Sequence, residues 1–295
     1  MRALSFNGRI RTLSERQAAR LLLLPTILFF LLFQYYPILK SLVISFFDYG
    51  LLRRNTPFVG LENYLRQFRD PLFLSALGNT LLFVAGCVAV GVALALFLAV
   101  LVESSGRWAK VYRTLYFMPV VTSLMATAMV WRWLYASNGL INFLLTLVGL
   151  SPQGWLLDAE LALPSLMALT VWKNLGFDMI LFAAALQSIP SEYYEVARLE
   201  GATPWQAFRF VTLPSLRSIV VLVGITAVIR SFQVFTIVLA MTQGGPVNAT
   251  RTIVYHIYEQ GIQYDEMGYA SAAAAVLLAL IGAMTYLQMR IDRKR

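Results

Sequence analysis

Charged side chains lie within two of the long apolar stretches of this chain. The stretch 161–187 carries Lys173 and Asp178, and the stretch 216–241 carries Arg230. An ionisable group inside a bilayer is costly, so it faces the protein interior, where it pairs with another group or lines a solute path. The chemistry open to these residues is therefore ion pairing and contact with a polar solute.

Catalytic and metal chemistry find no support in the sequence. It contains one cysteine, Cys87, and one histidine, His256, so neither an internal disulfide nor a zinc site can form. It has no G-x-S-x-G nucleophile motif and no G-x-x-x-x-G-K-[ST] phosphate loop. We expect no catalytic residue, no metal site and no cofactor bound by this chain, and we expect His256 in an outer loop without a special role.

The composition is typical of an integral membrane protein. Of 295 residues, 59% are hydrophobic and 13% are charged, and the mean hydropathy is +0.67. A spanning helix needs about 20 largely apolar residues. We predict an all-α, polytopic membrane fold with about six transmembrane helices, the first of them an uncleaved span. The six stretches are 21–45, 76–102, 114–135, 161–187, 216–241 and 269–289.

The basic residues predict how these spans are oriented. With the N-terminus inside, the inner segments hold 15 of the 24 lysines and arginines, and the outer segments hold six. This asymmetry satisfies the positive-inside rule, so a transmembrane domain of residues 21–290 is expected between cytoplasmic segments 1–20 and 291–295. The net charge of +9 follows from this topology and from contact with the lipid bilayer. Because the basic residues are dispersed on both sides, no nucleic-acid partner is expected.

A polar segment between the fourth and fifth spans, 191–214, has the signals of a helix, a turn and a second helix. Ser191 can cap the first helix, and Gly201 can end it in the left-handed conformation. Thr203 can cap the second helix, with Pro204 at its first position. The apolar face of that helix is formed by Trp205, Phe208 and Val211, and Pro214 ends it. Such a folded element is not needed merely to join two spans, so the segment predicts a docking site for another protein.

The same segment resembles the EAA loop of permeases of ATP-binding-cassette (ABC) importers, E-A-A-x(3)-G-x(9)-I-x-L-P. The match runs from Glu195-Val196-Ala197 through Gly201 to Val211-Thr212-Leu213-Pro214, with every spacing kept. The departures, Val196 and Val211, are small apolar replacements. The resemblance implies a cytoplasmic coupling loop, 188–217, that is seated in a nucleotide-binding domain. Its coupling residues are Glu195, Ala197, Gly201, Trp205, Phe208, Leu213 and Pro214.

Other segments are similar to the carbohydrate class of these importers, which includes maltose-type, oligosaccharide and glycerol-3-phosphate systems. They are 58–73, 131–145, 184–202 and 241–258, the last with an outer turn, Gly244-Gly245-Pro246, that a plain tight reversal would also explain. Within that class the chain looks like the first of two paired permeases. The resemblance implies a homologous second permease in a heterodimer, two cytoplasmic ATPase subunits holding ATP and Mg, and an extracytoplasmic solute-binding protein. It also implies a bacterial-type cytoplasmic (inner) membrane.

In maltose-type permeases the substrate contacts come from three stretches, in spans three and four and before the Gly-Gly-Pro turn. The corresponding positions here are Val120, Leu124, Trp172, Gly176, Ser231 and Gln233. The polar residues that complete the predicted path are Ser123, Lys173, Asn174, Asp178 and Arg230. Because Val120 and Leu124 are apolar, the chain departs from a maltose-like contact set, and the substrate stays open between a small sugar and a polyol. Lys173 and Arg230 keep a phosphorylated polyol among the alternatives.

Several of these residues could instead have a structural role. Asp178 can pair with Lys173 or with Arg230, and Lys173 can instead reach the outer surface with its long side chain. Trp172 suits the face of a sugar ring, but an aromatic side chain in a span equally serves packing or anchors the helix at the interface. Arg132 is expected at the membrane interface.

Two functions from different classes remain. The first is a permease subunit that forms half of a sugar pathway and works by alternating access. The second is a self-contained channel or secondary transporter whose cytoplasmic loop binds a regulator. The second predicts coupling-ion ligands at the midplane and an internal repeat, and neither is evident in the sequence. The spacing of the EAA-like segment favours the permease.

Overall fold

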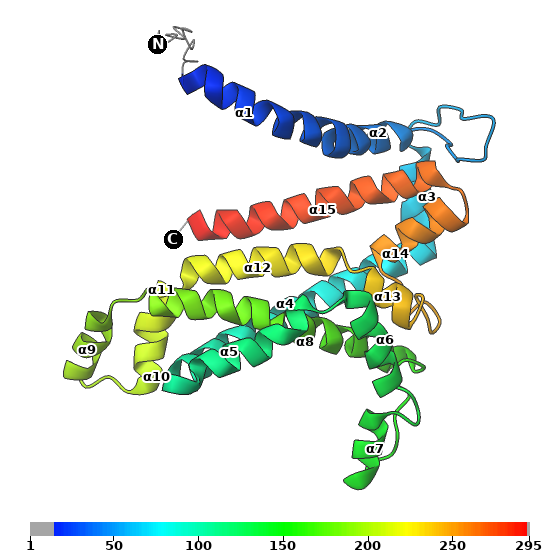
Figure 1. Cartoon of the computed structure of the whole chain (residues 1–295). Coiled ribbons are helices and arrows are strands. Elements are labelled where there is room, and N and C mark those ends of the chain that lie inside the picture. The colour runs from blue at the N-terminus through cyan, green and yellow to red at the C-terminus, as the bar shows by residue number, and fades with distance from the viewer. Residues whose placement is uncertain (1–14, 294–295) are drawn as a thin grey trace, which may run out of the picture.

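The computed structural model describes residues 15–293, and the fold of this part is helical throughout (Figure 1). Within it the only extended pairing is an isolated bridge between Phe47 and Phe58. The all-α prediction is therefore confirmed. Residues 1–14 and 294–295, which include most of the predicted cytoplasmic N-terminal segment and the end of the tail, lie outside the described residues.

Four helical runs are long and apolar enough to cross a membrane. They are Leu22–Ile44, α4 (Pro71–Ser104), α8 (Ala159–Gln187) and α15 (Met267–Arg293). The first run comprises most of α1 (Glu15–Phe30), a π-helical turn (Leu31–Tyr35) and α2 (Tyr36–Ile44). Helix α4 begins earlier than predicted, because Asp70 caps it by accepting a hydrogen bond from the Leu72 N–H (2.8 Å) and Pro71 occupies its first position.

The prediction of one continuous helix for the third span is wrong. Its first arm, 106–121, is bent by 98° against α6 (Leu124–Leu134). The first arm comprises η2 (Gly106–Trp108), α5 (Ala109–Phe117) and η3 (Met118–Val121). The helix breaks because Thr122 closes a turn on Pro119, its hydroxyl donating to the Pro119 carbonyl at 2.7 Å, and then adopts extended backbone.

The predicted fifth span, 216–241, is also interrupted. Helix α12 (Arg217–Phe232) ends before Gln233, and α13 (Thr236–Met241) is a separate short helix. The carbonyl of Val234, released at this break, accepts a hydrogen bond from the Thr252 hydroxyl at 3.2 Å. Two bent helix pairs, 106–121 with 124–134 and 204–215 with 217–232, bring the described part of the chain to up to six spans if each pair counts as one, as predicted.

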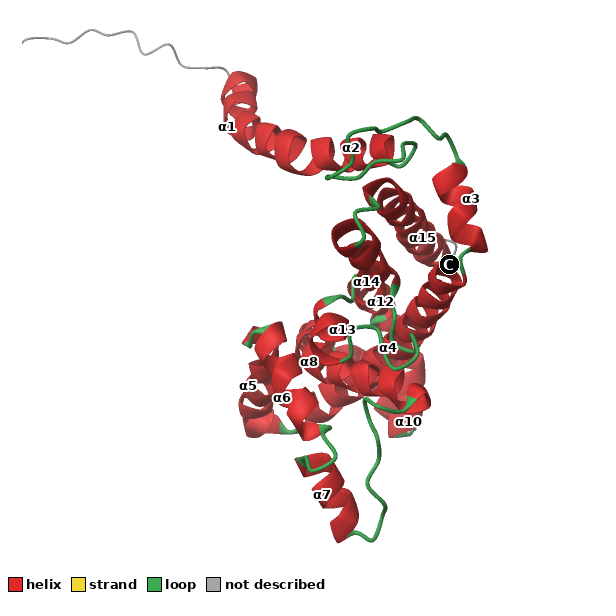
Figure 2. Cartoon of the chain, turned by 90° about the vertical axis from the view of Figure 1, so that its right-hand side faces the viewer, coloured by secondary structure: helices red, strands yellow, loops and turns green. Residues whose placement is uncertain are grey.

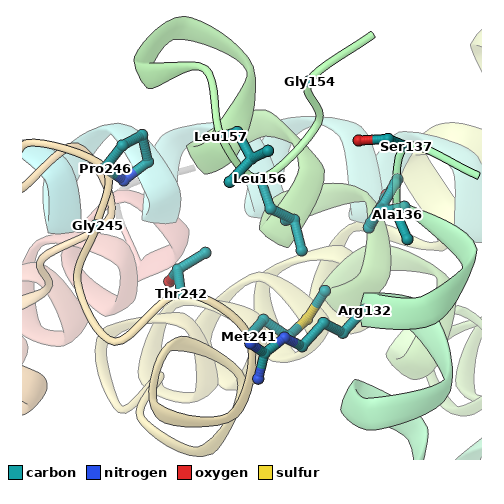
Figure 3. A pocket seen from close by; sticks show the side chains of 11 residues that line it. Arg132, Ala136, Ser137, Gly154, Leu156, Leu157, Met241, Thr242, Gly245 and Pro246 are labelled. Atoms are coloured by element: carbon teal, nitrogen blue, oxygen red, sulfur yellow. The ribbon is translucent and has the colours of Figure 1, made fainter. Parts of the chain in front are cut away.

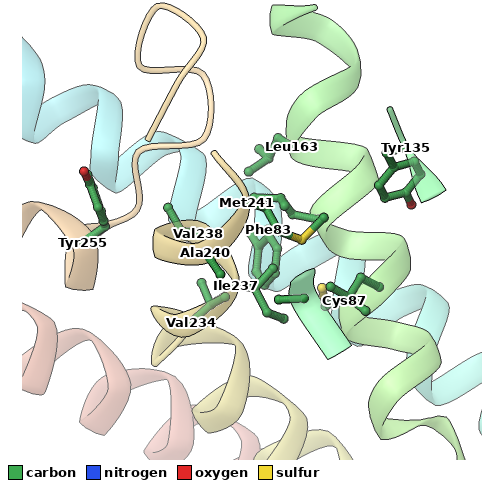
Figure 4. Close-up of a cluster of buried hydrophobic side chains, with 13 residues drawn as sticks. Phe83, Cys87, Tyr135, Leu163, Val234, Ile237, Val238, Ala240, Met241 and Tyr255 are labelled. Carbon is green, nitrogen blue, oxygen red and sulfur yellow. The ribbon is translucent and has the colours of Figure 1, made fainter. Parts of the chain in front are cut away.

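The core of the molecule lies where α4, α8 and α12 pack together. One buried cluster contains Phe83 and Cys87 of α4, Leu163 of α8, and Ile237 and Met241 of α13, whose side chains converge in Figure 4. The first span stands apart from this bundle (Figure 2): every side chain from 22 to 40 is exposed. The core is thus built without the first span.

The two ends of the bundle carry different elements (Figure 1). The beginning of α1, the end of α15, and the helical segment after α8 lie at one end. The opposite end carries α3 (Glu62–Arg69), α13, α14 (Ile253–Tyr258) and η5 (Glu259–Gln263), while α7 (Leu140–Leu147) projects from the body beyond α6 (Figure 2). The predicted cytoplasmic location of both chain ends stays a prediction.

At the opposite end His256 lies within α14, not in a loop as expected. Its ring is fully buried between the rings of Phe73 and Tyr269, with centroids 5.9 Å away in each case. Burial lowers the pKa of His256 to about 4; the Arg251 guanidinium acts in the same direction, and Asp70 opposes both. His256 is therefore neutral at pH 7 and serves as a packing residue.

Candidate functional site

The segment after α8 forms a helical hairpin that projects from the bundle (Figure 1). It comprises α9 (Ser191–Leu199), α10 (Pro204–Ala207), η4 (Phe208–Thr212) and α11 (Leu213–Ser215). Gly201 turns the chain with φ +77°, a conformation that side-chain-bearing residues rarely adopt. Thr203 and Gln206 form the predicted capping box: the Gln206 N–H donates to the Thr203 hydroxyl (3.3 Å), and the Thr203 N–H donates to the Gln206 side-chain oxygen (2.7 Å).

Two details of the predicted hairpin are wrong. Pro190 occupies the cap position of α9, and Ser191 is already the first helical residue, without a capping hydrogen bond. Pro214 does not end the second helix but lies inside α11, where the first turn tolerates a missing N–H; the chain bends by 67° before α12.

The hairpin, 191–215, exposes apolar side chains that no part of the described chain covers. Trp205 is 68% exposed and stacks on Phe208, with ring centroids 5.5 Å apart. Leu199 and Phe210 are 88% and 70% exposed. The two arms are held together by a 3.0 Å hydrogen bond between the hydroxyls of Tyr194 and Thr212. Of the other predicted coupling residues, Glu195, Leu213 and Pro214 are exposed, and Ala197 is half-buried.

A cavity of about 370 Å³ lies between the two interrupted spans and α8. Six of the residues predicted to form the substrate path line it: Val120, Leu124, Lys173, Asn174, Arg230 and Gln233. Other lining residues, which sequence reasoning missed, are Thr122, Thr170 and the segment 234–237. Thr122 and the segment 234–237 were missed because the breaks in spans three and five, at which they lie, were not expected.

Both cations of this cavity are already satisfied by the protein. Lys173 is 8% exposed, and its ammonium group donates to the carbonyl oxygens of Pro119, Val120 (3.2 Å) and Thr122 (2.8 Å), and to the Thr122 hydroxyl (3.0 Å). It therefore does not reach for the outer surface. Arg230 donates to both carboxylate oxygens of Asp178, at 2.7 Å each. Of the pairs considered for Asp178, the structure forms the one with Arg230.

The remaining predicted path residues lie away from this cavity. Trp172 lines an apolar groove on another face of α8, with its ring 5.3 Å from Trp131. Gly176 is buried against α5, and a Cβ there would come within 1.9 Å of the Tyr116 carbonyl oxygen. Ser231 is buried, and the exposed Ser123 accepts the Thr127 N–H through its carbonyl. Gly176 is thus a packing residue in this structure, whereas Trp172 is 40% exposed.

Comparison with known proteins identifies the family. The profile described as "binding-protein-dependent transport system inner membrane component" matches residues 91–295. The chain belongs to this family. The permease is 32% identical to the lactose transport system permease LacF of Rhizobium radiobacter, over 92% of each chain. It is 31% identical to the arabinooligosaccharide transport system permease AraP of Bacillus subtilis, over 95% of this chain and 90% of the relative.

Solved structures agree with this assignment. A chain of a bacterial ABC transporter that imports the acidic polysaccharide alginate matches with a TM-score of 0.83 and 25% identity, covering 94% of this chain and 95% of its own. The same transporter has been solved in complex with a periplasmic protein carrying an alginate pentasaccharide. The protein is therefore an integral membrane permease subunit of an ABC importer.

A second cavity of the permease, about 450 Å³, lies at the outer turn (Figure 3). It is lined by α6, the loop around 154–157, and Gly245 and Pro246 of the turn. The turn is tied down by Thr250, whose hydroxyl donates to the Gly245 carbonyl (2.6 Å) and lies 2.7 Å from the Thr242 hydroxyl. Arg132 is the one charged side chain among the described lining residues and donates to the Ala240 carbonyl at 3.3 Å.

Helices α6 and α13 separate the two cavities. Leu124 and Ile237, near the first ends of these helices, line the central cavity, whereas Arg132 and Met241, toward their last turns, line the outer one. No group of three or more His, Cys, Asp or Glu that could hold a metal is found within residues 15–293.

Proposed function

We propose that this permease forms half of a sugar pathway together with a homologous second permease. The observation that supports a partner inside the membrane is the first span, which is 0% buried in the isolated chain. The central cavity also supports a partner, because this chain would form one wall of a path that lies between two subunits. The proposal also includes a location in a bacterial-type cytoplasmic membrane with both termini in the cytoplasm, as the distribution of basic residues favours.

We also propose that the importer has two ATPase subunits, which hold ATP and Mg, and that one of them docks on the hairpin 191–215. The observation that carries this proposal is the uncovered apolar surface around Trp205 and Phe208 on a rigidly capped hairpin. Trp205 is exposed and stacks on the half-buried Phe208, and an exposed tryptophan on a folded element is typical of an interaction site. Closure of the ATPases would move the hairpin, and α8 and α12, to which it is joined, would transmit the movement to the cavity.

A solute-binding protein is proposed to deliver the sugar at the opposite end. The family's own description names dependence on a binding protein, and an alginate-transporter relative has been solved with its periplasmic protein. The loop 48–60 is firmly attached there, because Asp265 accepts the N–H groups of Leu51 (2.6 Å) and Leu52 (3.0 Å). It offers a fixed surface for docking.

The charges of the central cavity favour an uncharged sugar over a phosphorylated polyol. The Arg230 guanidinium is neutralised by Asp178, and the donors of Lys173 are occupied by four oxygen atoms. This half of the path therefore offers amide and hydroxyl groups, from Asn174, Gln233 and Thr236, while each of its cations has a partner within the protein. Screening of the co-purified binding protein against neutral oligosaccharides, uronates and phosphorylated polyols tests this. Selective retention of an anionic ligand would contradict it.

The coupling role is tested by charge substitutions in the hairpin. Gly201→Asp and Glu195→Lys should abolish the solute-stimulated ATPase activity of the purified complex, or the docking of the ATPase, while insertion of the permease stays normal. Glu160→Lys, an equivalent charge reversal at the opposite end of α8, serves as the matched control and should leave the activity unchanged. Normal stimulation in both hairpin variants would refute the coupling role.

A further inference from the structure

The position of Lys173 is compatible with two roles, contact with a substrate and stabilisation of the fold. It lines the central cavity, but its ammonium group is surrounded by oxygen atoms of a single short segment, 119–122. An ammonium group has three protons. With four acceptors of the same segment within reach, these donors are used within the protein, and none is left for a solute.

The segment that Lys173 contacts is the break of the third span. A helix that ends leaves its last carbonyl groups without intrahelical partners. Thr122 and Ser123 adopt extended backbone, so they cannot continue the helix and satisfy those carbonyls. At membrane depth an unsatisfied carbonyl is especially costly. The Pro119 carbonyl also accepts from the Thr122 N–H and hydroxyl, whereas the carbonyls of Val120 and Thr122 receive their donor from the ammonium group. A cation is also favoured at the negative end of the helix.

A second observation ties the same face of α8 to the same arm. Gly176 lies three residues after Lys173 and therefore on the same side of the helix. The absence of a side chain at Gly176 lets the backbone of Tyr116 and Phe117 approach α8 closely. Gly176 thus brings the first arm of span three against α8, and Lys173 holds the end of that arm one turn away.

We propose that Lys173 is a positioning residue that caps the broken end of span three and fixes the angle between its two arms. It acts on the path through Val120 and Leu124, which flank the break and form part of the cavity wall. The consequence for transport rests on the proposed function of this cavity. The effect on the break itself does not, and can be measured whatever solute is carried.

The geometry is tested by pulsed electron spin resonance on the assembled complex. Spin labels at Tyr112→Cys and Met129→Cys, both exposed, report the distance between the two arms in a Cys87→Ser background. Lys173→Met should broaden or shift the single distance peak. Lys110→Met, an exposed lysine on the same arm, is the matched control and should leave the peak unchanged.

If Lys173→Met fails to assemble, Thr122→Val removes only one of the acceptors and should broaden the peak to a lesser extent. An unchanged peak in the assembled Lys173→Met complex, or in Thr122→Val when only that variant assembles, would overturn the proposal. A broadened peak in Lys173→Met would uphold the role of Lys173 even if the hairpin variants Gly201→Asp and Glu195→Lys kept normal ATPase stimulation. That second result would refute only the coupling proposal. The two proposals can therefore fail separately.

Chemical restoration of the amine provides a second readout that a simple packing role would not give. In the Cys87→Ser background, Lys173→Cys can be alkylated with 2-bromoethylamine, the thiolate displacing bromide to give a side chain that differs from lysine by one sulfur atom. Iodoacetamide gives a side chain of similar length that ends in a neutral amide. Binding-protein-stimulated ATPase activity should return with the amine and not with the amide. Equal recovery with both reagents would overturn the proposal.

Discussion

Gly176→Ala is the substitution for which the structure gives the sharpest expectation. A Cβ at this position would lie 1.9 Å from the Tyr116 carbonyl oxygen and 2.9 Å from the Phe117 Cα. Both neighbours are backbone atoms of α5, so no side chain can rotate away. Ordinary contact begins at 3.4 Å, and α5 and α8 would therefore have to move apart.

The magnitude follows from the cost of overpacking. One extra methyl group in a packed interior typically costs about 1–3 kcal/mol. For a protein of this size, 1 kcal/mol corresponds to roughly 2–4 °C in the midpoint of thermal unfolding. We therefore expect Gly176→Ala to unfold roughly 2–12 °C below the parent protein. A larger residue such as Val at the same position should lower the midpoint further.

The buried thiol of Cys87 provides the assay. It is the only cysteine of the chain and is 6% exposed, so a fluorogenic maleimide reacts with it only when the bundle opens. Heating the detergent-solubilised complex with this reagent gives the unfolding midpoint. The matched control is Gly282→Ala in α15, where a Cβ meets nothing within 4 Å and the better helix propensity of alanine should leave the midpoint unchanged or raise it.

Equal midpoints for Gly176→Ala and its parent would refute the close packing of α5 on α8. The same result would remove one of the two supports for the role of Lys173, because both residues are argued to hold the same arm. A loss of stability in the control equal to that in Gly176→Ala would show that the assay does not resolve local packing.

Three further expectations concern other parts of the molecule. Arg230→Met leaves the buried carboxylate of Asp178 without its partner and should destabilise the permease by about 2–4 kcal/mol, measured from the unfolding midpoint. The loss stays below that of a fully buried pair because Arg230 is itself 31% exposed. The double variant Arg230→Met/Asp178→Leu should recover part of it. Thr203→Ala removes the capping box and should cost about 0.5–2 kcal/mol of local stability, measured as faster amide hydrogen exchange in residues 204–212. Ser191→Ala removes no cap and should leave the exchange rates in α9 unchanged. The depressed pKa of His256 means that the unfolded chain takes up a proton near pH 6.5 and the folded chain only near pH 4. The free energy of unfolding should therefore fall as pH drops through this range, by about 3 kcal/mol in total. His256→Phe should remove this pH dependence of the unfolding midpoint.

The long uninterrupted spans and the hairpin were readable from the sequence because their signals are local. An apolar run of sufficient length predicted α4, α8 and α15, and the Thr203–Gln206 pair with Gly201 predicted the turn and cap of the hairpin. Such signals depend only on neighbouring residues, and the structure keeps them.

The breaks in spans three and five were not predicted, because hydropathy counts apolar residues without asking whether the helix continues. Pro119 and Thr122 stand within an apolar stretch, and the break that they produce is stabilised by Lys173, more than fifty residues away in sequence. For the same reason the substrate-path prediction mixed cavity residues with packing residues. Adjacent positions such as Trp172 and Lys173 point to different faces of α8, and only the packing of the neighbouring helices decides which face meets the cavity.

The isolated first span has a consequence for how such proteins can diversify. Its side chains from 22 to 40 contribute nothing to the buried core, and the profile shared by the family begins only at residue 91, within α4. Mutations there are constrained by hydropathy and by whatever neighbour covers the helix, and hardly by the rest of the chain. The sequence of this helix is therefore free to change together with a particular companion subunit while the transporting body stays the same.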